Sequence, residues 1–183
     1  MTILKTSFAA LSITVAASVA FAENPMVGGA PMLVEQNIVE NAVNSADHTT
    51  LVAAVQAAGL VETLQSEGPF TVFAPVNDAF AALPEGTVET LLMPENIDML
   101  TTILTCHVVG ATVMSDAIAA MIMDADGTYP VETLGGCTLQ ATMTDDMIQL
   151  TDENGTVATV TIADVVQSNG VIHVIDAVLT PAM

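Results

Sequence analysis

After Lys5 the chain contains no lysine and no arginine, although it carries 21 aspartates and glutamates. No salt bridge with Lys or Arg can therefore form anywhere in residues 6–183. The carboxylates can be balanced only by His48, His107 and His173, by an N-terminal amine, by helix N-termini and by cations from solvent. Hydrophobic residues make up 52% of the chain, which is too apolar for intrinsic disorder.

The same charge excludes several classes of partner. A net charge of −20 repels phosphate backbones and anionic lipid headgroups, which argues against binding to nucleic acid and to an anionic membrane surface. With no Trp, and with Tyr129 as the single Tyr, a platform for base stacking is also disfavoured. We interpret the charge as adaptation to a saline environment together with solubility of a very apolar chain. Binding of a cationic partner is the alternative interpretation.

The N-terminal segment has the pattern of a secretory signal peptide. Lys5 is followed by an apolar run that ends in an A-x-A site at residues 20–22, before the acidic Glu23. The run is short for a membrane span, and no Cys near this site could carry a lipid. We therefore predict cleavage between Ala22 and Glu23, and a secreted or periplasmic protein without a lipid or transmembrane anchor.

The segment that follows, residues 23–36, contains Asn24-Pro25 and Gly28-Gly29 and is predicted to be a flexible N-terminal tail. Two cysteines, Cys106 and Cys137, remain in the exported chain, and an oxidising compartment favours a disulfide between them. Two buried free thiols are the alternative. A zinc site is disfavoured because only His107 lies near either Cys in sequence, whereas a structural zinc site usually needs four ligands.

The rest of the chain changes character from helical to extended. Helical patterns begin at Asn37 and are expected at 37–43, 51–58, 60–65, 79–83, 88–92, 94–104 and 116–123, with Asn77 or Asp78 capping the fourth and Ser115 the last. Strands are expected at 70–74, 106–109, 131–134, 137–143, 147–151, 156–162 and 171–179, with a hairpin turn at Asn154-Gly155. Because most expected helices lie in the first part of the chain and most expected strands in the second, the order of elements predicts an α+β fold.

Two segments resemble the conserved blocks of the fasciclin (FAS1) domain family. The first runs from Gly68 to Phe80 and reads GPFTVFAPVNDAF; the second runs from Ser168 to Asp176, reads SNGVIHVID, and is followed by Val178-Leu179-Thr180-Pro181. Between them lies ILTCHVV at residues 103–109, which resembles the Tyr-His segment of that family. The resemblance implies a single domain over residues 37–181, with a helical layer packed on a β-sheet wedge.

The resemblance also supplies the candidate interaction residues. The family-motif positions in this chain are Thr71, Phe73, Ala74, Pro75, Asn77, Asp78, Ala79, Phe80, His107, Asn169, Gly170, His173 and Asp176. Cys106 stands where the family usually has Tyr, so a Tyr-His adhesion epitope does not carry over, and the substitution is interpreted as a bridge to Cys137. The chain also has no Arg-Gly-Asp tripeptide, because it has only Lys5 as a basic residue.

By resemblance, we expect an exported, non-enzymatic protein of adhesion or matrix interaction, whose partner is a cell-surface or matrix protein or glycan. The alternative is a periplasmic module that binds a ligand or a cation through its acidic turns or a methionine-lined surface. Neither acidic turn, 124–127 or 152–155, has EF-hand spacing, and no cofactor or metal site is predicted. For the methionines, core filling is favoured over a binding surface.

A third hypothesis, a hydrolase centred on Cys106, His107 or His173, is weakly supported. Neither Ser115 nor Ser168 lies in a nucleophile motif. Adjacent residues of a strand point to opposite faces, which separates Cys106 from His107 if both lie in a strand. We expect both motif histidines to be buried, neutral and hydrogen-bonded, with Asn77 or Asp78 as the partner of His107.

Overall fold

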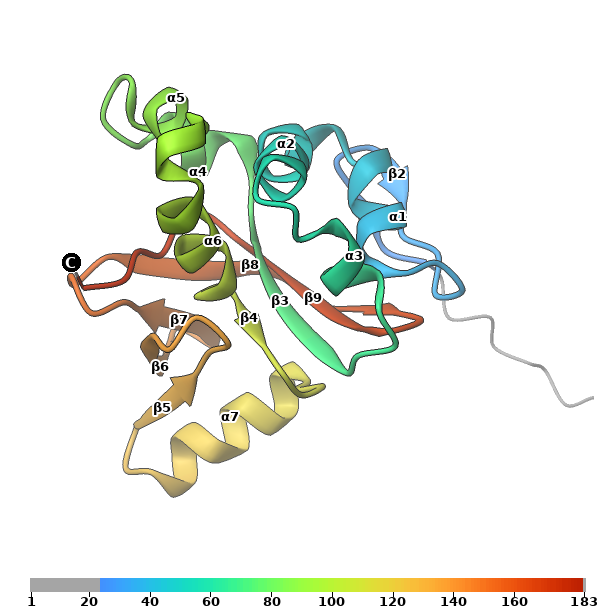
Figure 1. Ribbon diagram of the computed structural model, residues 1–183. Helices are drawn as coiled ribbons and strands as arrows, with labels where there is room; N and C mark the ends of the chain where they lie inside the picture. Colours follow the sequence, from blue (N-terminus) through green and yellow to red (C-terminus); the bar gives the residue numbers. More distant parts are fainter. Residues whose placement is uncertain (1–23, 183) are drawn as a thin grey trace, which may run out of the picture.

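The computed structural model describes residues 24–182, in which a layer of helices packs over one seven-stranded sheet (Figure 1). The predicted α+β class is confirmed. The predicted signal peptide, residues 1–22, and its cleavage site between Ala22 and Glu23 lie outside the described residues. Within residues 24–182, no helix combines the length and the apolar character that crossing a bilayer requires.

The helices are short and fall mostly in the first half of the chain. They are α1 (Ile38–Asn44), α2 (Thr49–Ala57), α3 (Val61–Gln65), α4 (Asn77–Ala81), α5 (Thr87–Leu91), α6 (Ile97–Thr105) and α7 (Ser115–Asp124), with 3-10 turns η1 (Ala46–His48) and η2 (Pro94–Asn96). Asn37 begins the series with a reciprocal cap: its Oδ1 accepts from the Glu40 N–H, and Glu40 accepts from the Asn37 N–H, both at 3.0 Å.

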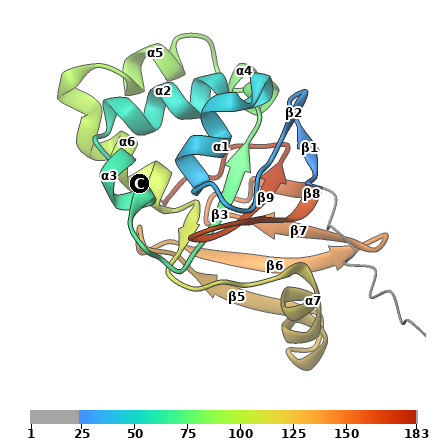
Figure 2. The ribbon, with the colours of Figure 1, turned by 90° about the vertical axis from the view of Figure 1, so that its right-hand side faces the viewer.

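The strands are β1 (Met26–Val27), β2 (Ala30–Pro31), β3 (Phe70–Pro75), β4 (Val108–Val109), β5 (Thr128–Glu132), β6 (Thr138–Thr144), β7 (Met147–Thr151), β8 (Val157–Gln167) and β9 (Gly170–Ile175). The order in the main sheet is β4-β3-β9-β8-β7-β6-β5, so β4 and β5 are its edges. Only β3 and β9 pair in parallel. Figure 2 shows α1 and α2 above the sheet and α7 below it, beside β5.

Two apolar cores lie on the two faces of the sheet, and β3 and β9 contribute to both. Val72 and Val174 face the core beneath α1, α2 and α6, whereas Phe73 and Ile175 face the core closed by α7. All six residues of β9 and five of the six in β3 are buried. This burial on both faces explains why the two strands are almost entirely apolar in sequence.

The segment predicted as a flexible tail is packed in its described part. Residues 26–31 form the β1–β2 hairpin, and Val27 and Met32, which are 3% and 2% exposed, belong to the core beneath α1 and α2. Gly28 has a positive φ of 58° in the hairpin turn. The Gly28-Gly29 signal marked the turn between β1 and β2, and the apolar residues on either side of it supply the burial that a tail would lack.

Two further expectations need correction. The strand predicted at 106–109 contains only Val108 and Val109, because α6 continues to Thr105 and Cys106 is its C-cap residue. The caps predicted for α4 and α7 do not form: Val76 and Met114 precede these helices without side-chain capping bonds, while Asn77 and Ser115 lie inside them. Both side chains are used instead in the longer-range contacts described below.

Candidate functional site

The two motif blocks lie side by side as β3 and β9. Their parallel register pairs Phe70 with Gly170 and continues without interruption to the pair of Pro75 and Ile175. A Cβ added at Gly170 would collide with the backbone carbonyl of Phe70, and this explains why the block requires glycine there. The motif glycine therefore serves the close approach of two strands.

Asn169 joins three segments at the start of β9. Its Oδ1 accepts a hydrogen bond from the Ile38 N–H at 3.1 Å, and its Nδ2 donates to the carbonyls of Leu64 at 2.7 Å and Ser66 at 2.9 Å. The side chain is 7% exposed. It thus connects the beginning of α1 and the end of α3 to the sheet, and all of its polar atoms are satisfied internally.

Thr71 and His173, one from each block, hold the connection between β4 and α7. The Thr71 hydroxyl donates to the Ala111 carbonyl at 2.6 Å and accepts from the Val113 N–H at 2.8 Å. His173 Nε2 lies 2.9 Å from the Val113 carbonyl, while Nδ1 accepts from the Asp164 N–H at 3.2 Å. Both motif side chains are 0% exposed. Their shared role is to position residues 111–113.

Asp164 completes this anchor but does not form a catalytic triad. It lies at an irregularity of β8 with a positive φ of 57°, and its carboxylate accepts from the backbone N–H of Ser115 at 2.7 Å and from the Ser115 hydroxyl. His173 contacts the backbone of Asp164 and does not contact Ser115. A Ser-His-Asp triad needs a hydrogen bond between the serine and the histidine, and Ser115 and His173 do not form one.

The other residues of the first block have different environments. Asn77 accepts from the Thr50 N–H at 3.0 Å and donates to the Ala46 carbonyl at 2.9 Å, so it caps the beginning of α2 from outside that helix. Phe73, Ala74, Pro75 and Ala79 are buried, Phe80 is half-buried and Asp78 is exposed. In the second block, Asp176 is exposed and accepts from the Thr159 N–H at 2.6 Å.

His107 does not contact Asn77 or Asp78, contrary to our expectation. Because Cys106 ends α6, the His107 ring lies against that helix, with Nδ1 2.8 Å from the Ile103 carbonyl. Nε2 accepts from the Leu179 N–H at 2.9 Å. This pair of contacts fixes the neutral tautomer with its proton on Nδ1. His107 therefore connects α6 to the segment that follows β9.

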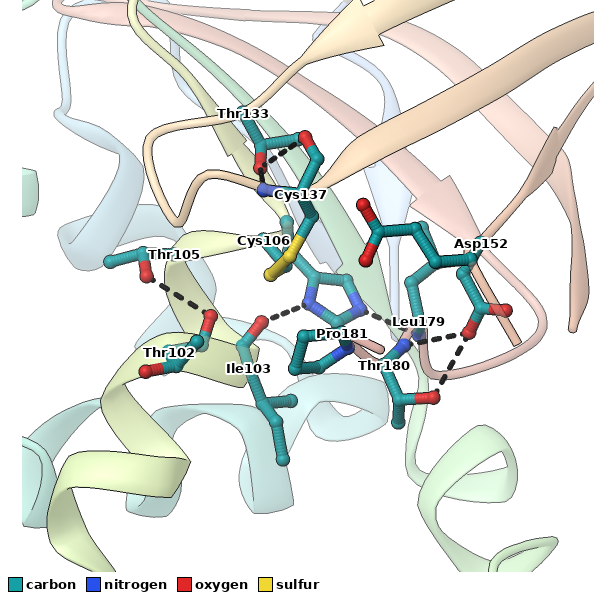
Figure 3. Close-up of a disulfide and its surroundings, with 12 residues drawn as sticks. Thr102, Ile103, Thr105, Cys106, Thr133, Cys137, Asp152, Leu179, Thr180 and Pro181 are labelled. Carbon is teal, nitrogen blue, oxygen red and sulfur yellow. Dashed lines mark hydrogen bonds between the residues drawn. A yellow bond between two sulfur atoms is a disulfide. The ribbon is translucent and has the colours of Figure 1, made fainter. Parts of the chain in front are cut away.

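The disulfide between Cys106 and Cys137 is present, with 5.4 Å between the Cα atoms. It connects the end of α6 to the residue before β6, and Figure 3 shows the two bridged cysteines. Cys106 is 0% exposed and His107 is 2% exposed. A partner in solution cannot contact this dipeptide in the described fold, and the disulfide leaves no thiolate for nucleophilic catalysis.

Asp152 anchors the same C-terminal segment from the turn between β7 and β8. Its carboxylate accepts from the N–H groups of Asn154, Thr156 and Thr180 and from the Thr180 hydroxyl, at 2.8–3.0 Å. Burial alone would raise the pKa of Asp152, but the hydrogen bonds from Thr180 and Thr156 outweigh burial and hold the pKa below its usual value. These oxygens are saturated by donors, which argues against the calcium-binding alternative for this turn.

All three histidines are buried. Burial lowers the pKa of His107 to about 4, although the Ile103 carbonyl and the charge of Asp152 act in the opposite direction. Burial also lowers the pKa of His48 and His173. No three His, Cys, Asp or Glu side chains come together as a metal-binding group in the described part of the chain. The histidines therefore act as neutral structural groups.

A cleft of about 520 Å³ lies between the two edges of the sheet, where the sequence predicted no site. Its walls come from β4 and the loop after it, from α7 and from β5, and Phe73 and Ile118 close its floor. Two of its lining residues, Thr71 and Phe73, belong to the first motif block, but the others come from separate elements that no motif connects. Only the curvature of the sheet brings them together.

The expectation that methionines fill the core is wrong for six of the nine methionines in residues 24–182. Met26, Met93, Met99, Met123, Met143 and Met147 are 39–72% exposed. Met32 is buried, and Met121 lines the cleft. The surface of the described residues thus combines carboxylates with scattered flexible apolar side chains.

Comparison with known proteins places this architecture in a family. A family model described as the fasciclin domain matches residues 46–181. The Synechocystis protein sll1483 is 51% identical over 146 residues, which cover 80% of this chain and 74% of that protein. Transforming growth factor-beta-induced protein ig-h3 of Sus scrofa is 39% identical over 131 residues, which cover 72% of this chain but only 17% of that protein.

A solved structure shows the same arrangement. The FAS1 domain pair from the insect cell adhesion molecule Fasciclin I superposes with a TM-score of 0.56 at 25% identity, over 69% of this chain and 42% of that chain. The parallel β3–β9 pair, the helical layer and the motif blocks define a fasciclin domain, and the chain belongs to the fasciclin domain family.

Proposed function

We propose that this chain is an exported, non-enzymatic fasciclin-domain protein that mediates adhesion or matrix interaction by binding a cell-surface or matrix protein or glycan. One observation carries the proposal: the polar motif side chains that are buried hold parts of the fold together. Thr71, His107, Asn169 and His173 all satisfy backbone groups of distant segments. The motifs thus build a scaffold, and recognition is left to its outer surface.

Membership of the fasciclin family also supports the adhesion proposal, since Fasciclin I is described as an insect cell adhesion molecule. Apart from histidine, every charged side chain in residues 24–182 is a carboxylate. Carboxylates accept hydrogen bonds from glycan hydroxyls and protein amides and pair with basic groups. We propose export because of the signal-peptide pattern at residues 1–22.

A pelleting assay tests adhesion. Residues 23–183 have no lysine, so an amine-reactive dye labels only the N-terminal amine and leaves the described surface unmodified. The labelled protein is mixed with cell envelopes and exopolysaccharide in molar NaCl, beside an acidic control protein of matched charge. Saturable pelleting above the control is expected. Pelleting equal to that of the control contradicts adhesion.

Two matched triple variants locate the adhesive face. Glu85, Glu89 and Glu95 are exposed along α4–α6, and Asp124, Asp145 and Asp146 are exposed at the end of α7 and in the β6–β7 turn. Changing each set to the corresponding amides removes three charges from one face. Adhesion through a defined surface predicts that one triple variant loses pelleting and the other keeps it. An equal loss of pelleting in the two triple variants would indicate non-specific charge effects.

The cleft between β4 and β5 favours a second function, a periplasmic ligand-binding module. Its volume of about 520 Å³ lies within the usual range of small-molecule sites, and its walls are mainly apolar. Intrinsic fluorescence tests this function, because Tyr129 lines the cleft and is the only Tyr in a chain without Trp. Saturable change of the Tyr129 emission by a neutral, non-aromatic apolar compound such as cyclohexylbutanol is expected. No change at millimolar concentration contradicts it.

A further inference from the structure

We propose that the cleft between β4 and β5 binds a small molecule with an apolar body and a positively charged end, such as an alkyl amine, with Glu132 at its mouth as the partner of the charge. This inference rests on the second function proposed above and specifies its ligand. The cleft is lined mainly by apolar side chains from β3, β4, α7, β5 and the loop after β4, including Phe73, Val109, Val113, Ile118, Met121, Tyr129 and Val131.

The cleft is held open by fixed contacts. At one end the edges of the sheet are tied together, because the Leu134 N–H donates to the Val108 carbonyl at 2.8 Å and the disulfide bridges Cys106 to Cys137. At the other end, Thr71 and His173 hold residues 111–113 against β3 and β9. A site formed in advance loses little conformational entropy when a ligand enters.

An added strand from a protein partner does not fit this gap well. The Thr133 N–H bonds to the Cys137 carbonyl, so alternation directs the backbone groups of Pro130 and Glu132 toward the cleft. Pro130 has no N–H, and the Thr128 N–H is already bonded to the Ala125 carbonyl. The edge of β5 therefore lacks the regular donors that pairing with a strand requires, which favours a small molecule.

The charge of the ligand follows from the surroundings of the cleft. Glu132 is exposed at the mouth, whereas Phe73 and Ile118, at the floor, are 1% and 2% exposed. Residues 24–182 contain no Lys or Arg that could pair with an anionic ligand. An apolar body in the cleft would thus leave a cationic end beside the Glu132 carboxylate, while a carboxylate in the same place would be repelled.

The test compares three compounds with the same apolar body: cyclohexylbutylamine, cyclohexylbutanol and cyclohexylbutanoate. None is aromatic, so the emission of Tyr129 reports on the cleft without interference. We expect affinity to fall from the amine to the alcohol to the carboxylate. Glu132→Gln should lower the affinity for the amine by roughly twofold to fivefold, as expected for an exposed ion pair, and should leave the affinity for the alcohol unchanged.

Two matched variants on α7 show whether binding occurs in the cleft. Met121 lines it, whereas Met123 is 72% exposed on the same helix and does not line it. Met121→Asn should lower the affinity for the amine and for the alcohol by roughly fivefold to tenfold, and Met123→Asn should leave both affinities unchanged. Equal effects of the two variants would overturn the location of the site.

The remaining outcomes separate the two levels of the proposal. If the carboxylate binds as tightly as the amine, the cleft is a ligand site but the inference about charge is wrong. If none of the three compounds changes the Tyr129 emission at millimolar concentration, both the ligand-binding function and the inference fail. Neither result affects the adhesion proposal, which the pelleting assay tests on its own.

Discussion

His107 Nε2 accepts a hydrogen bond from the backbone N–H of Leu179 at 2.9 Å, across 72 residues of sequence. The opposite ring nitrogen contacts the Ile103 carbonyl at 2.8 Å. One neutral imidazole thus joins the end of α6 to the segment after β9, and its ring is almost completely buried. The position that resembles an adhesion motif is therefore a structural connection.

Replacing His107 should destabilise the fold strongly. His107→Leu leaves the buried Leu179 N–H and the Ile103 carbonyl without partners, which costs about 2–4 kcal/mol of unfolding free energy. Urea unfolding monitored by circular dichroism measures the loss. His48→Leu is the control: His48 is also buried, but its only side-chain hydrogen bond joins Nδ1 to the nearby Ser45 hydroxyl at 2.8 Å, and its Nε2 has no hydrogen-bond partner among the described residues. Equal losses in the two variants would contradict the role assigned to His107.

The stabilisation supplied by His107 should depend on pH. Its pKa is lowered from 6.5 to about 4 in the folded state, so the unfolded chain binds the proton more readily. The contribution is complete above pH 6.5 and is lost as the pH falls from 6.5 toward 4, by about 3 kcal/mol.

The difference in unfolding free energy between the wild type and His107→Leu isolates this effect, because protonation of the carboxylates affects both proteins alike. The difference should be largest at neutral pH and should shrink on acidification. A difference that stays constant from neutral pH to pH 4 would show that the buried imidazole is not held neutral.

Much of this architecture could be predicted from local sequence. The apolar runs 70–74 and 171–179 were predicted as strands and contain β3 and β9, although β9 ends at Ile175, and Asn37 marked the beginning of α1 correctly. The single domain with a helical layer on a β-sheet came from the resemblance, whereas the parallel pairing of β3 with β9 was not predicted, since periodicity alone does not specify which strands pair. The confirmed α+β fold thus needed both kinds of information.

The partners of the polar side chains could not be predicted in the same way. Asn77 had the sequence of a local helix cap, yet it caps α2 because the end of β3 lies beside that helix. His107 missed its expected partner because α6 continues to Thr105 with Cys106 as its C-cap residue, so His107 follows the end of a helix and does not lie inside a strand. The cleft was not predicted either, because its walls meet only when β4 and β5 approach each other. Each of these contacts depends on the path of the whole chain.

Asn169 should be as important for stability as a large core residue. Asn169→Ala removes hydrogen bonds to Ile38, Leu64 and Ser66 at a buried site, and we expect a loss of about 2–4 kcal/mol. Asn169→Asp keeps the acceptor for the Ile38 N–H but replaces both donors with a charge near two carbonyls. It should be at least as destabilising as Asn169→Ala in urea unfolding. An Asp variant close to wild type would show that the amide donors contribute little.

The disulfide should add stability mainly by restricting the unfolded chain. It links residues 31 apart, for which the loop-entropy model gives about 3–4 kcal/mol. The double variant Cys106→Ala/Cys137→Ala should lower the unfolding free energy by that order while keeping the native circular dichroism spectrum. Reduction of the wild-type protein should lower its stability in the same direction, and the double variant should not respond to reductant. An unchanged urea midpoint in the double variant would argue against this contribution.

Salt should stabilise the folded chain, because no Lys or Arg in residues 24–182 offsets its carboxylates. The Debye length falls from about 10 Å at 0.1 M ionic strength to about 3 Å at 1 M, which screens repulsion between neighbouring surface charges. The thermal midpoint should therefore rise between low and molar NaCl. The triple variant Glu85→Gln/Glu89→Gln/Glu95→Gln carries fewer charges on the α4–α6 face and should show a smaller rise. A midpoint that does not rise between low and molar NaCl would contradict the interpretation of the charge as adaptation to a saline environment.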